Sequence, residues 1–197
     1  MAVMRSGNAH HQMKKNNLFA SLTPGLRSAL VGLGLALLTI LYGQGMGIVF
    51  GLNEDAIQNR LKASAAEVRL TAYKGDDAAM KVVLANSWNF MRRAHLHAGG
   101  MGTTAFALMI LVGLLGIPRL ASSLIGIGLG AGGLGYSVFW MWAGFRAPGL
   151  GTTAAAKESL KWLAMPSAGA FVLATLAVLT LLIAALVSRS ESSPPNE

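Results

Sequence analysis

Two histidines, His95 and His97, lie two residues apart at the start of a long apolar segment. Imidazole nitrogens are common ligands of metal ions and haem iron, and they can also hydrogen-bond to a quinone. Ligating side chains are costly beside hydrocarbon, so histidines at the mouth of a membrane segment suggest a site. The other two histidines, His10 and His11, lie in a polar N-terminal tail and are weaker candidates.

Helix geometry limits what these histidines can bind. Residues two apart on a regular helix point about 200° from one another, so His95 and His97 share one metal ion only if the segment is unwound. Gly99 and Gly102 share a face with His95 and leave room for a planar ring, whereas Met101 offers a thioether beside His97. If a cofactor is bound, haem b or copper fits these residue types, with His95, His97 and Met101 as the cofactor-binding residues and the two histidines as the metal ligands. The alternative is that both imidazoles only form hydrogen bonds.

Other chemistry is sparse. The chain has no cysteine, which excludes disulfides, thiolate metal sites and iron–sulfur clusters. The apolar segments hold no carboxylate, and no Ser–His–Asp arrangement is suggested by the spacing. Gln44 is the main other polar residue within them, and we interpret it as a helix–helix hydrogen bond. The sequence does not indicate an enzyme that acts alone.

The segment Ala94-His95-Leu96-His97, with Gly102 five residues later, resembles the Ala-His-x-His-(x)4-Gly signature of small bacterial membrane proteins related to haem–copper oxidase subunit one. In that family, histidines at the start of a membrane helix bind haem or copper. The resemblance covers about ten of the 197 residues. Thr103 stands where the family has an aromatic residue, and the later apolar segments lack histidine. The resemblance implies a one-haem or accessory role, with further ligands from a partner.

The composition is that of an integral membrane protein. Hydrophobic residues make up 53% of the chain and charged residues 12%, whereas a soluble domain needs roughly twice that charged fraction. Four apolar blocks of about 20 residues or more can each cross a bilayer core of ~30 Å. We predict an all-α, four-transmembrane-helix bundle with spans at residues 28–51, 95–117, 120–145 and 166–187.

The remaining residues form two tails and one long connection. Residues 1–27 are predicted to be a polar, basic N-terminal tail and residues 188–197 a disordered C-terminal tail. Apolar residues recur at helical spacing in residues 52–91, which predicts two amphipathic helices separated near Gly75, with Asp77 as the N-cap of the second. We interpret this connection as a cap lying on the bilayer, with a ligand lid as the alternative.

Glycine and aromatic residues have clear positions in the apolar blocks. Gly43 and Gly47 share one helix face, and Gly126 and Gly130 share another. Such rows allow helix backbones to approach closely, so they predict tight packing inside the bundle or against a partner subunit. Aromatic residues near the ends of the blocks predict an interfacial belt: Trp88, Tyr136, Phe139, Trp140, Trp142, Phe145 and Trp162.

The charge distribution fits a membrane surface. The formal net charge is +8, but the basic residues flank the apolar blocks and do not alternate with aromatic residues, so nucleic-acid binding is not expected. Arg5, Lys14, Lys15 and Arg27 favour cytoplasmic termini in a bacterial inner membrane, whereas the basic residues of the connection, from Arg60 to Arg93, favour the opposite orientation. The expected partners are the lipid bilayer and other membrane subunits or further copies of the chain.

Two functions follow as hypotheses. The first is an accessory, redox-linked small subunit of a bacterial membrane complex that contacts haem, copper or quinone through His95 or His97. The second is a non-catalytic scaffold or assembly subunit that packs on partner helices through its glycine-rich faces.

Overall fold

The computed structural model describes residues 24–191, and every regular element among them is a helix. The helices are α1 (Pro24–Glu67), α2 (Asp77–Leu115), α3 (Arg119–Leu150), α4 (Thr153–Glu158) and α5 (Lys161–Glu191). Four of them, α1, α2, α3 and α5, are long and apolar enough to cross a membrane. His10, His11 and most of both predicted tails lie outside the described residues.

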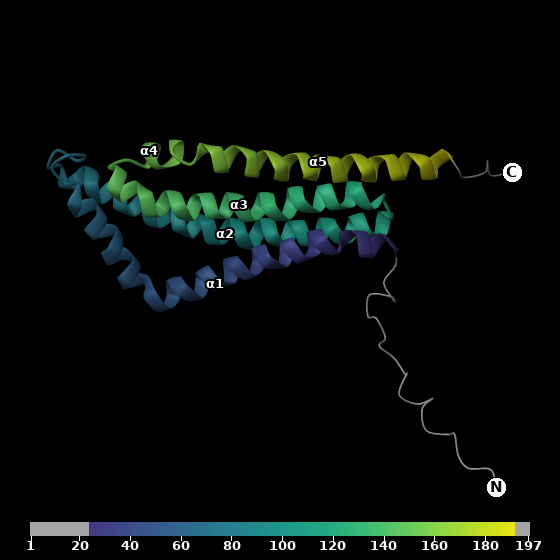
Figure 1. Ribbon diagram of the computed structural model, residues 1–197, viewed down its shortest axis with the longest axis horizontal. Helices are drawn as coiled ribbons and strands as arrows, with labels where there is room; N and C mark the ends of the chain where they lie inside the picture. The colour runs from purple at the N-terminus through teal and green to yellow at the C-terminus, as the bar shows by residue number, and fades with distance from the viewer. Residues whose placement is uncertain (1–23, 192–197) are drawn as a thin grey trace, which may run out of the picture.

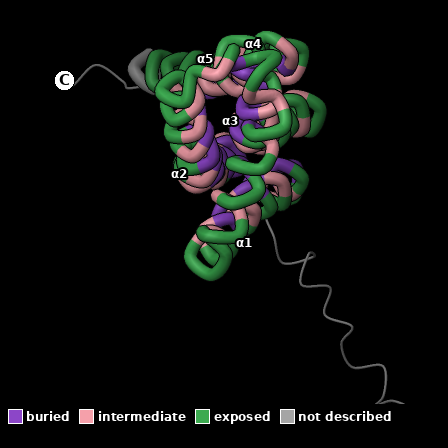
Figure 2. Tube along the Cα trace, turned by 90° about the vertical axis from the view of Figure 1, so that its left-hand side faces the viewer, coloured by how far each residue is buried: buried purple, intermediate pink, exposed green. Residues whose placement is uncertain are grey.

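The long helices run back and forth, so the start of α1 and the end of α5 lie at the same end of the molecule (Figure 1). α1, α2 and α3 pack on one another, whereas α5 packs on α3 and touches α2 only slightly. The arrangement is therefore a three-helix core with α5 on the outside of α3, and not four equivalent helices around one axis. Buried residues concentrate where the core helices meet, and little of α5 is buried (Figure 2).

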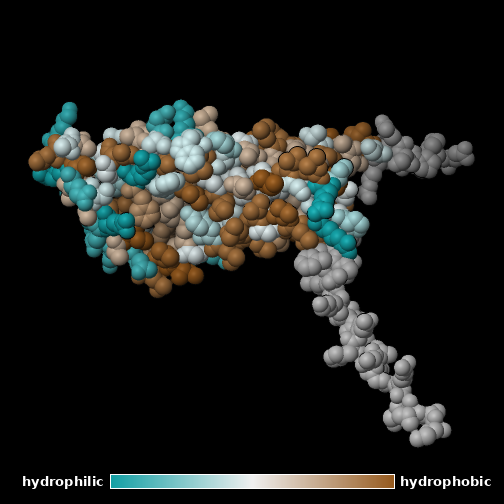
Figure 3. All heavy atoms as spheres, in the orientation of Figure 1, coloured by the Kyte–Doolittle hydropathy of each residue, from teal (hydrophilic) through white to brown (hydrophobic). Residues whose placement is uncertain are grey.

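Two helices are much longer than a membrane span. α1 has 44 residues and α2 has 39, which correspond to roughly 66 and 58 Å, against a bilayer core of ~30 Å. The surplus forms what we call the head, residues 54–93 and 139–165, at the left of Figure 1. Hydrophilic residues gather over the head, and hydrophobic residues cover much of the rest of the visible face (Figure 3).

The head has an apolar core of its own, which changes the interpretation of the connection. α2 is helical without a break from Asp77 to Leu115, so its first half continues along the same axis as its apolar half. The buried side chains of the head come from α1, α2, α3, α4, the turn after α1 and the link between α4 and α5: Ala65, Tyr73, Val83, Phe90, Phe139, Ala143, Ala147, Ala156 and Leu160. This core packs the amphipathic parts of α1 and α2 against α3 and α4.

A kink in α1 brings its second half back to α2. Asn53 has φ −132° and ψ 25°, outside the helical region, and joins two helical stretches at the point where the apolar block ends. Asparagine competes for backbone hydrogen bonds through its side chain, which makes it a poor residue for a helix interior. Beyond the kink Leu61 is only 2% exposed.

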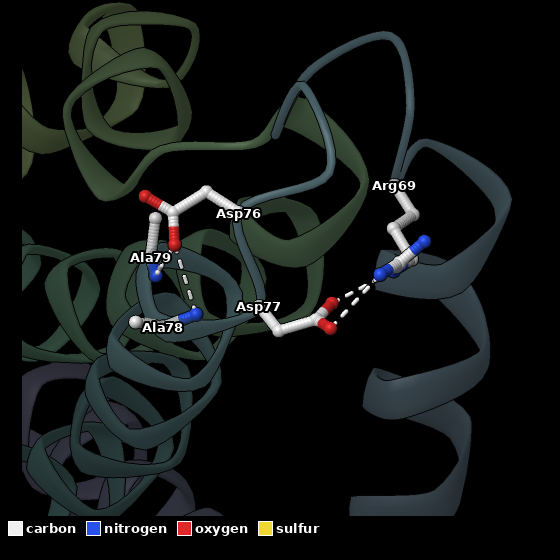
Figure 4. Close-up of polar contacts among 5 residues, drawn as sticks. All are labelled: Arg69, Asp76, Asp77, Ala78 and Ala79. Atoms are coloured by element: carbon white, nitrogen blue, oxygen red, sulfur yellow. Dashed lines mark hydrogen bonds and ion pairs between the residues drawn. The ribbon is translucent and has the colours of Figure 1, made fainter.

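The predicted N-cap of α2 is wrong by one residue. Asp76, and not Asp77, accepts hydrogen bonds from the backbone N–H groups of Ala78 and Ala79, both at 2.9 Å (Figure 4). Positive φ angles of 53° at Lys74 and 79° at Gly75 complete the preceding turn, and Asp76 is then the first extended residue. Asp77 lies in the first helical turn and pairs instead with Arg69 of the turn after α1.

Helix ends differ from the predicted spans by several residues. α1 already begins at Pro24, and α5 continues to Glu191, so both helices extend into segments expected to be tails. α3 continues to Leu150, and α5 begins before Pro166, which lies within the helix. Apolar length predicts only the part of a helix that can cross hydrocarbon, whereas packing in the head allows the same helices to continue beyond it.

The four glycines predicted to pack lie against neighbouring helices. A Cβ at Gly126 would lie 2.7 Å from the Cα of Gly32, and one at Gly130 would meet the Cβ of Leu35, so α3 crosses α1 closely at both levels. On α1, a Cβ at Gly43 would lie 3.0 Å from the Cβ of Ala98 on α2. Backbones can approach this closely only where side chains are absent.

Candidate functional sites on the two sides of α2

The regular course of α2 separates the two histidines. His95 lies against α1 and His97 lies against α3, on opposite sides of one unbroken helix. They therefore cannot bind the same ion, as the geometry of a regular helix requires. Within residues 24–191, no group of three or more histidine, aspartate or glutamate side chains is placed to hold a metal ion.

His95 is fixed by α1. Its Nδ1 lies 2.8 Å from the carbonyl oxygen of Gly43. A carbonyl oxygen can only accept, so Nδ1 carries the proton and donates, and Nε2 of the neutral ring is an acceptor. One turn further along α1, a Cβ at Gly47 would lie 2.9 Å from Cε1 of the ring. Gly43 thus supplies the hydrogen bond and Gly47 the room for the imidazole.

The space expected for a planar ring beside His95 is largely taken by α1. A Cβ at Gly102 would lie 2.8 Å from Cγ1 of Ile40 and 3.3 Å from the carbonyl oxygen of Ala36. At Gly99, by contrast, a Cβ would meet nothing within 4 Å. The glycines of this face of α2 therefore serve helix packing at Gly102 and leave open space only at Gly99.

His97 belongs to an aromatic cluster between α2 and α3. Its ring centroid lies 5.1 Å from that of Tyr136 and 6.2 Å from that of Trp140. Met101 also faces α3, since a Cβ at Gly133 would lie 3.3 Å from the Cβ of Met101. His97 and Met101 are thus on the same side of α2, as predicted from their spacing, and the structure describes no hydrogen bond of the His97 ring.

This cluster corrects the expectation of a simple aromatic belt. Tyr136, Phe139 and Trp140 pack with Phe90 inside the protein, and the Nε1 of Trp140 is buried without a hydrogen-bond partner among the described residues. The guanidinium of Arg93 lies 5.2 Å from the Trp140 ring centroid, a cation–π contact.

The aromatic residues on the protein surface lie further along the chain. Trp142, Phe145 and Trp162 are exposed, so these members of the predicted belt lie on the surface of the head.

A second feature, which the sequence analysis missed, is a groove between α1 and α2 beside His95. We call it the kink groove. It has a volume of about 480 Å³ and is lined by Gly47, Phe50, Gly51, Glu54, Trp88, Arg92, His95 and Leu96. The sequence signal for it is limited to Gly47 and Gly51 shortly before Asn53, because the kink that opens the groove is a property of the folded helix.

No family model, curated protein or solved structure matches the chain. What the protein does is therefore inferred from the contacts of its own residues.

Proposed function

We propose that the chain is a multi-pass protein of the bacterial inner membrane that acts as a packing or assembly subunit, and not as an enzyme by itself. Gln44 is the observation on which this rests. It lies on the exposed side of α1, between Gly43, which is buried against α2, and the exposed Gly45. Its neighbours Leu41 and Ile48 are 61% and 63% exposed.

The amide of Gln44 has no hydrogen-bond partner among the described residues, although its position within the apolar part of α1 calls for one. A polar amide in hydrocarbon without a partner is costly, and hydrogen bonds between membrane helices contribute about 0.6–2 kcal/mol. We therefore infer that a helix of another membrane subunit, or of a second copy of this chain, supplies the partner. Gly45, where a Cβ would meet nothing within 4 Å, permits close approach.

The test compares Gln44→Leu with Asn59→Leu, which removes an exposed amide from the head. Complexes are extracted in mild detergent and their composition is determined by native mass spectrometry. We expect Gln44→Leu to lose most of the partner or second copy while it keeps wild-type helicity, and Asn59→Leu to behave as wild type. An unchanged complex in Gln44→Leu would remove the support for this function.

The head supports an orientation opposite to that expected from the N-terminal tail. More than half of the chain's 16 lysines and arginines lie in the head, because the ends of α3 and α4 and the start of α5 add Arg146, Lys157 and Lys161 to those of the long connection. Under the positive-inside rule we infer that the head faces the cytoplasm and that both termini lie on the other side.

The redox-linked role is a second candidate, supported by His97 and Met101. Both face α3, and a thioether beside an imidazole suits copper or haem iron. The resemblance of residues 94–102 to relatives of haem–copper oxidase subunit one agrees with such a role. Visible spectra and metal analysis of the purified protein, of His97→Ala and of His95→Ala test it: loss of a cofactor only in His97→Ala supports it, and a wild-type protein without haem or metal refutes it.

A further inference from the structure

We propose that the kink groove binds a phospholipid headgroup that carries both a phosphate and a primary ammonium group. The inference rests on the membrane placement proposed above, because it requires the groove to lie where the apolar part of α1 ends. Glu54 directly follows the kink residue Asn53, and Gly47 lies within the apolar block. The groove therefore spans roughly 10 Å from the apolar segment into the head, enough to cross an interfacial layer of about 5–8 Å.

The size of the groove suits a headgroup better than a single ion. Its volume of about 480 Å³ is many times the ~30 Å³ that one water occupies. The space exists because α1 has no side chain at Gly51 and then turns at Asn53. At Gly51 a Cβ would meet nothing within 4 Å, so this part of the wall stands away from the rest of the protein.

The two walls carry opposite charges that are not paired with each other. Glu54 comes from α1 and Arg92 from α2. In the described part of the chain the salt bridges are Arg69–Asp77 and Lys161–Glu158, so neither groove residue has a charged partner there. Gln58 donates a hydrogen bond to Oε1 of Glu54 at 2.8 Å, which helps to hold the carboxylate in place.

These charges favour a zwitterion with N–H donors. A guanidinium binds phosphate through paired hydrogen bonds, and a carboxylate binds an ammonium group. A headgroup with phosphate alone would satisfy Arg92 but would be repelled by Glu54. A quaternary ammonium group would satisfy the charge of Glu54 without donating hydrogen bonds. An ethanolamine-type headgroup can place its phosphate at Arg92 and its ammonium group at Glu54.

His95 and the aromatic residues complete the site. Nδ1 of His95 donates its hydrogen bond to the carbonyl oxygen of Gly43. Nε2 is therefore the ring atom left to accept a hydrogen bond from an ammonium or hydroxyl group. Phe50 and Trp88, with ring centroids 5.3 Å apart, form an apolar wall for the glycerol region. Leu96 is 66% exposed and leads from the groove along the apolar part of α2, where an acyl chain can lie.

The experiment titrates the full-length protein in detergent with phosphatidylethanolamine, phosphatidylcholine and phosphatidylglycerol of identical acyl chains. Bound lipid is counted by native mass spectrometry. We expect phosphatidylethanolamine to bind at least tenfold more tightly than the other two. Glu54→Gln should lose the preference for phosphatidylethanolamine over phosphatidylglycerol. Arg92→Gln should weaken the binding of all three lipids at least fivefold.

Glu67→Gln and Lys81→Gln are matched controls, because they remove exposed charges of the head outside the groove. Equal binding of the three lipids, or identical binding by the groove and control variants, would overturn the proposal. Competition by soluble glycerophosphoethanolamine at the affinity of the lipid would assign the site to a free headgroup and overturn the lipid assignment. Circular dichroism excludes loss of fold as the cause.

Failure here can be separated from failure of the proposed function. If the protein does not insert into vesicles, as judged by resistance to carbonate extraction, both proposals are wrong. If it inserts and Gln44→Leu disrupts its complexes but no lipid is preferred, only the groove assignment is wrong.

Discussion

The imidazole of His95 is positioned by two glycines of α1, Gly43 and Gly47. The carbonyl of Gly43 accepts its Nδ1–H, and the missing side chain of Gly47 leaves the space that the ring occupies. A carbonyl oxygen has two lone pairs, so Gly43 can accept from His95 and still accept a helical N–H. Helix association at this level therefore depends on hydrogen bonding and on shape together.

Gly47→Ala is expected to destabilise the protein more than Gly51→Ala. The new Cβ at position 47 would lie 2.9 Å from Cε1 of His95, so the ring must move and its bond to Gly43 is weakened. At position 51 a Cβ meets nothing, and replacing glycine by alanine in a helix gains up to about 1 kcal/mol. Thermal unfolding in one detergent measures both variants. A Gly47→Ala protein as stable as Gly51→Ala would show that the ring adapts without cost.

The turn between α1 and α2 is held by polar contacts on its exposed side. Arg69 donates to both carboxylate oxygens of Asp77, at 2.7 and 2.8 Å (Figure 4). On the buried side, Tyr73 donates to the carbonyl oxygen of Pro148 at 2.8 Å and thereby ties the turn to the end of α3. Burial raises the pKa of the Tyr73 hydroxyl, which keeps it protonated as a donor at neutral pH.

The Arg69–Asp77 pair gives the turn a pH dependence of known sign. The hydrogen bond from Arg69 lowers the pKa of Asp77. A carboxyl with a lowered pKa stabilises the fold above its unfolded pKa of about 4, and this contribution disappears as the pH falls through the lower folded value. Both groups are exposed, so the effect is small. The melting-temperature difference between wild type and Asp77→Asn should be present at pH 7, begin to shrink near pH 4 and vanish as the pH falls through the lowered pKa of folded Asp77. A constant difference would contradict the ionic explanation.

Close crossing of α1 and α3 should make Gly130 intolerant of a side chain. A Cβ there would meet the Cβ and backbone of Leu35, and the carbonyl of Gly130 accepts a hydrogen bond from Thr39 at 3.2 Å. Gly130→Leu should therefore separate the two helices and lower the yield of folded protein. Gly100→Leu is the matched control, because a Cβ at this exposed position of α2 meets nothing within 4 Å. Equal yields and equal melting temperatures would place the critical contact elsewhere.

Apolar length and glycine spacing in the sequence predicted the long helices and the four packing glycines, because both signals are local. The kink groove could not be predicted in this way, since Glu54 and Arg92 come from different helices and meet only because α1 turns at Asn53. Gly32 was overlooked for the same reason, because its importance depends on Gly126 of α3. The placement of His95 and His97 on opposite sides of α2 depends on whether the helix is regular there, which the spacing of the two residues could not decide.

For the molecule as a whole, the side of the membrane that the head faces can be measured directly, because the chain has no cysteine of its own. Single cysteines at Lys74, in the exposed turn of the head, and at Arg119, at the opposite end, give two reporters in otherwise identical proteins. Because the head holds most of the basic residues, we expect Lys74→Cys to be shielded from a membrane-impermeant maleimide in cells with a permeabilised outer membrane, and Arg119→Cys to be labelled. The reverse pattern would show that basic residues at the termini determine insertion. Labelling of both positions in intact inner membranes would contradict a spanning arrangement altogether.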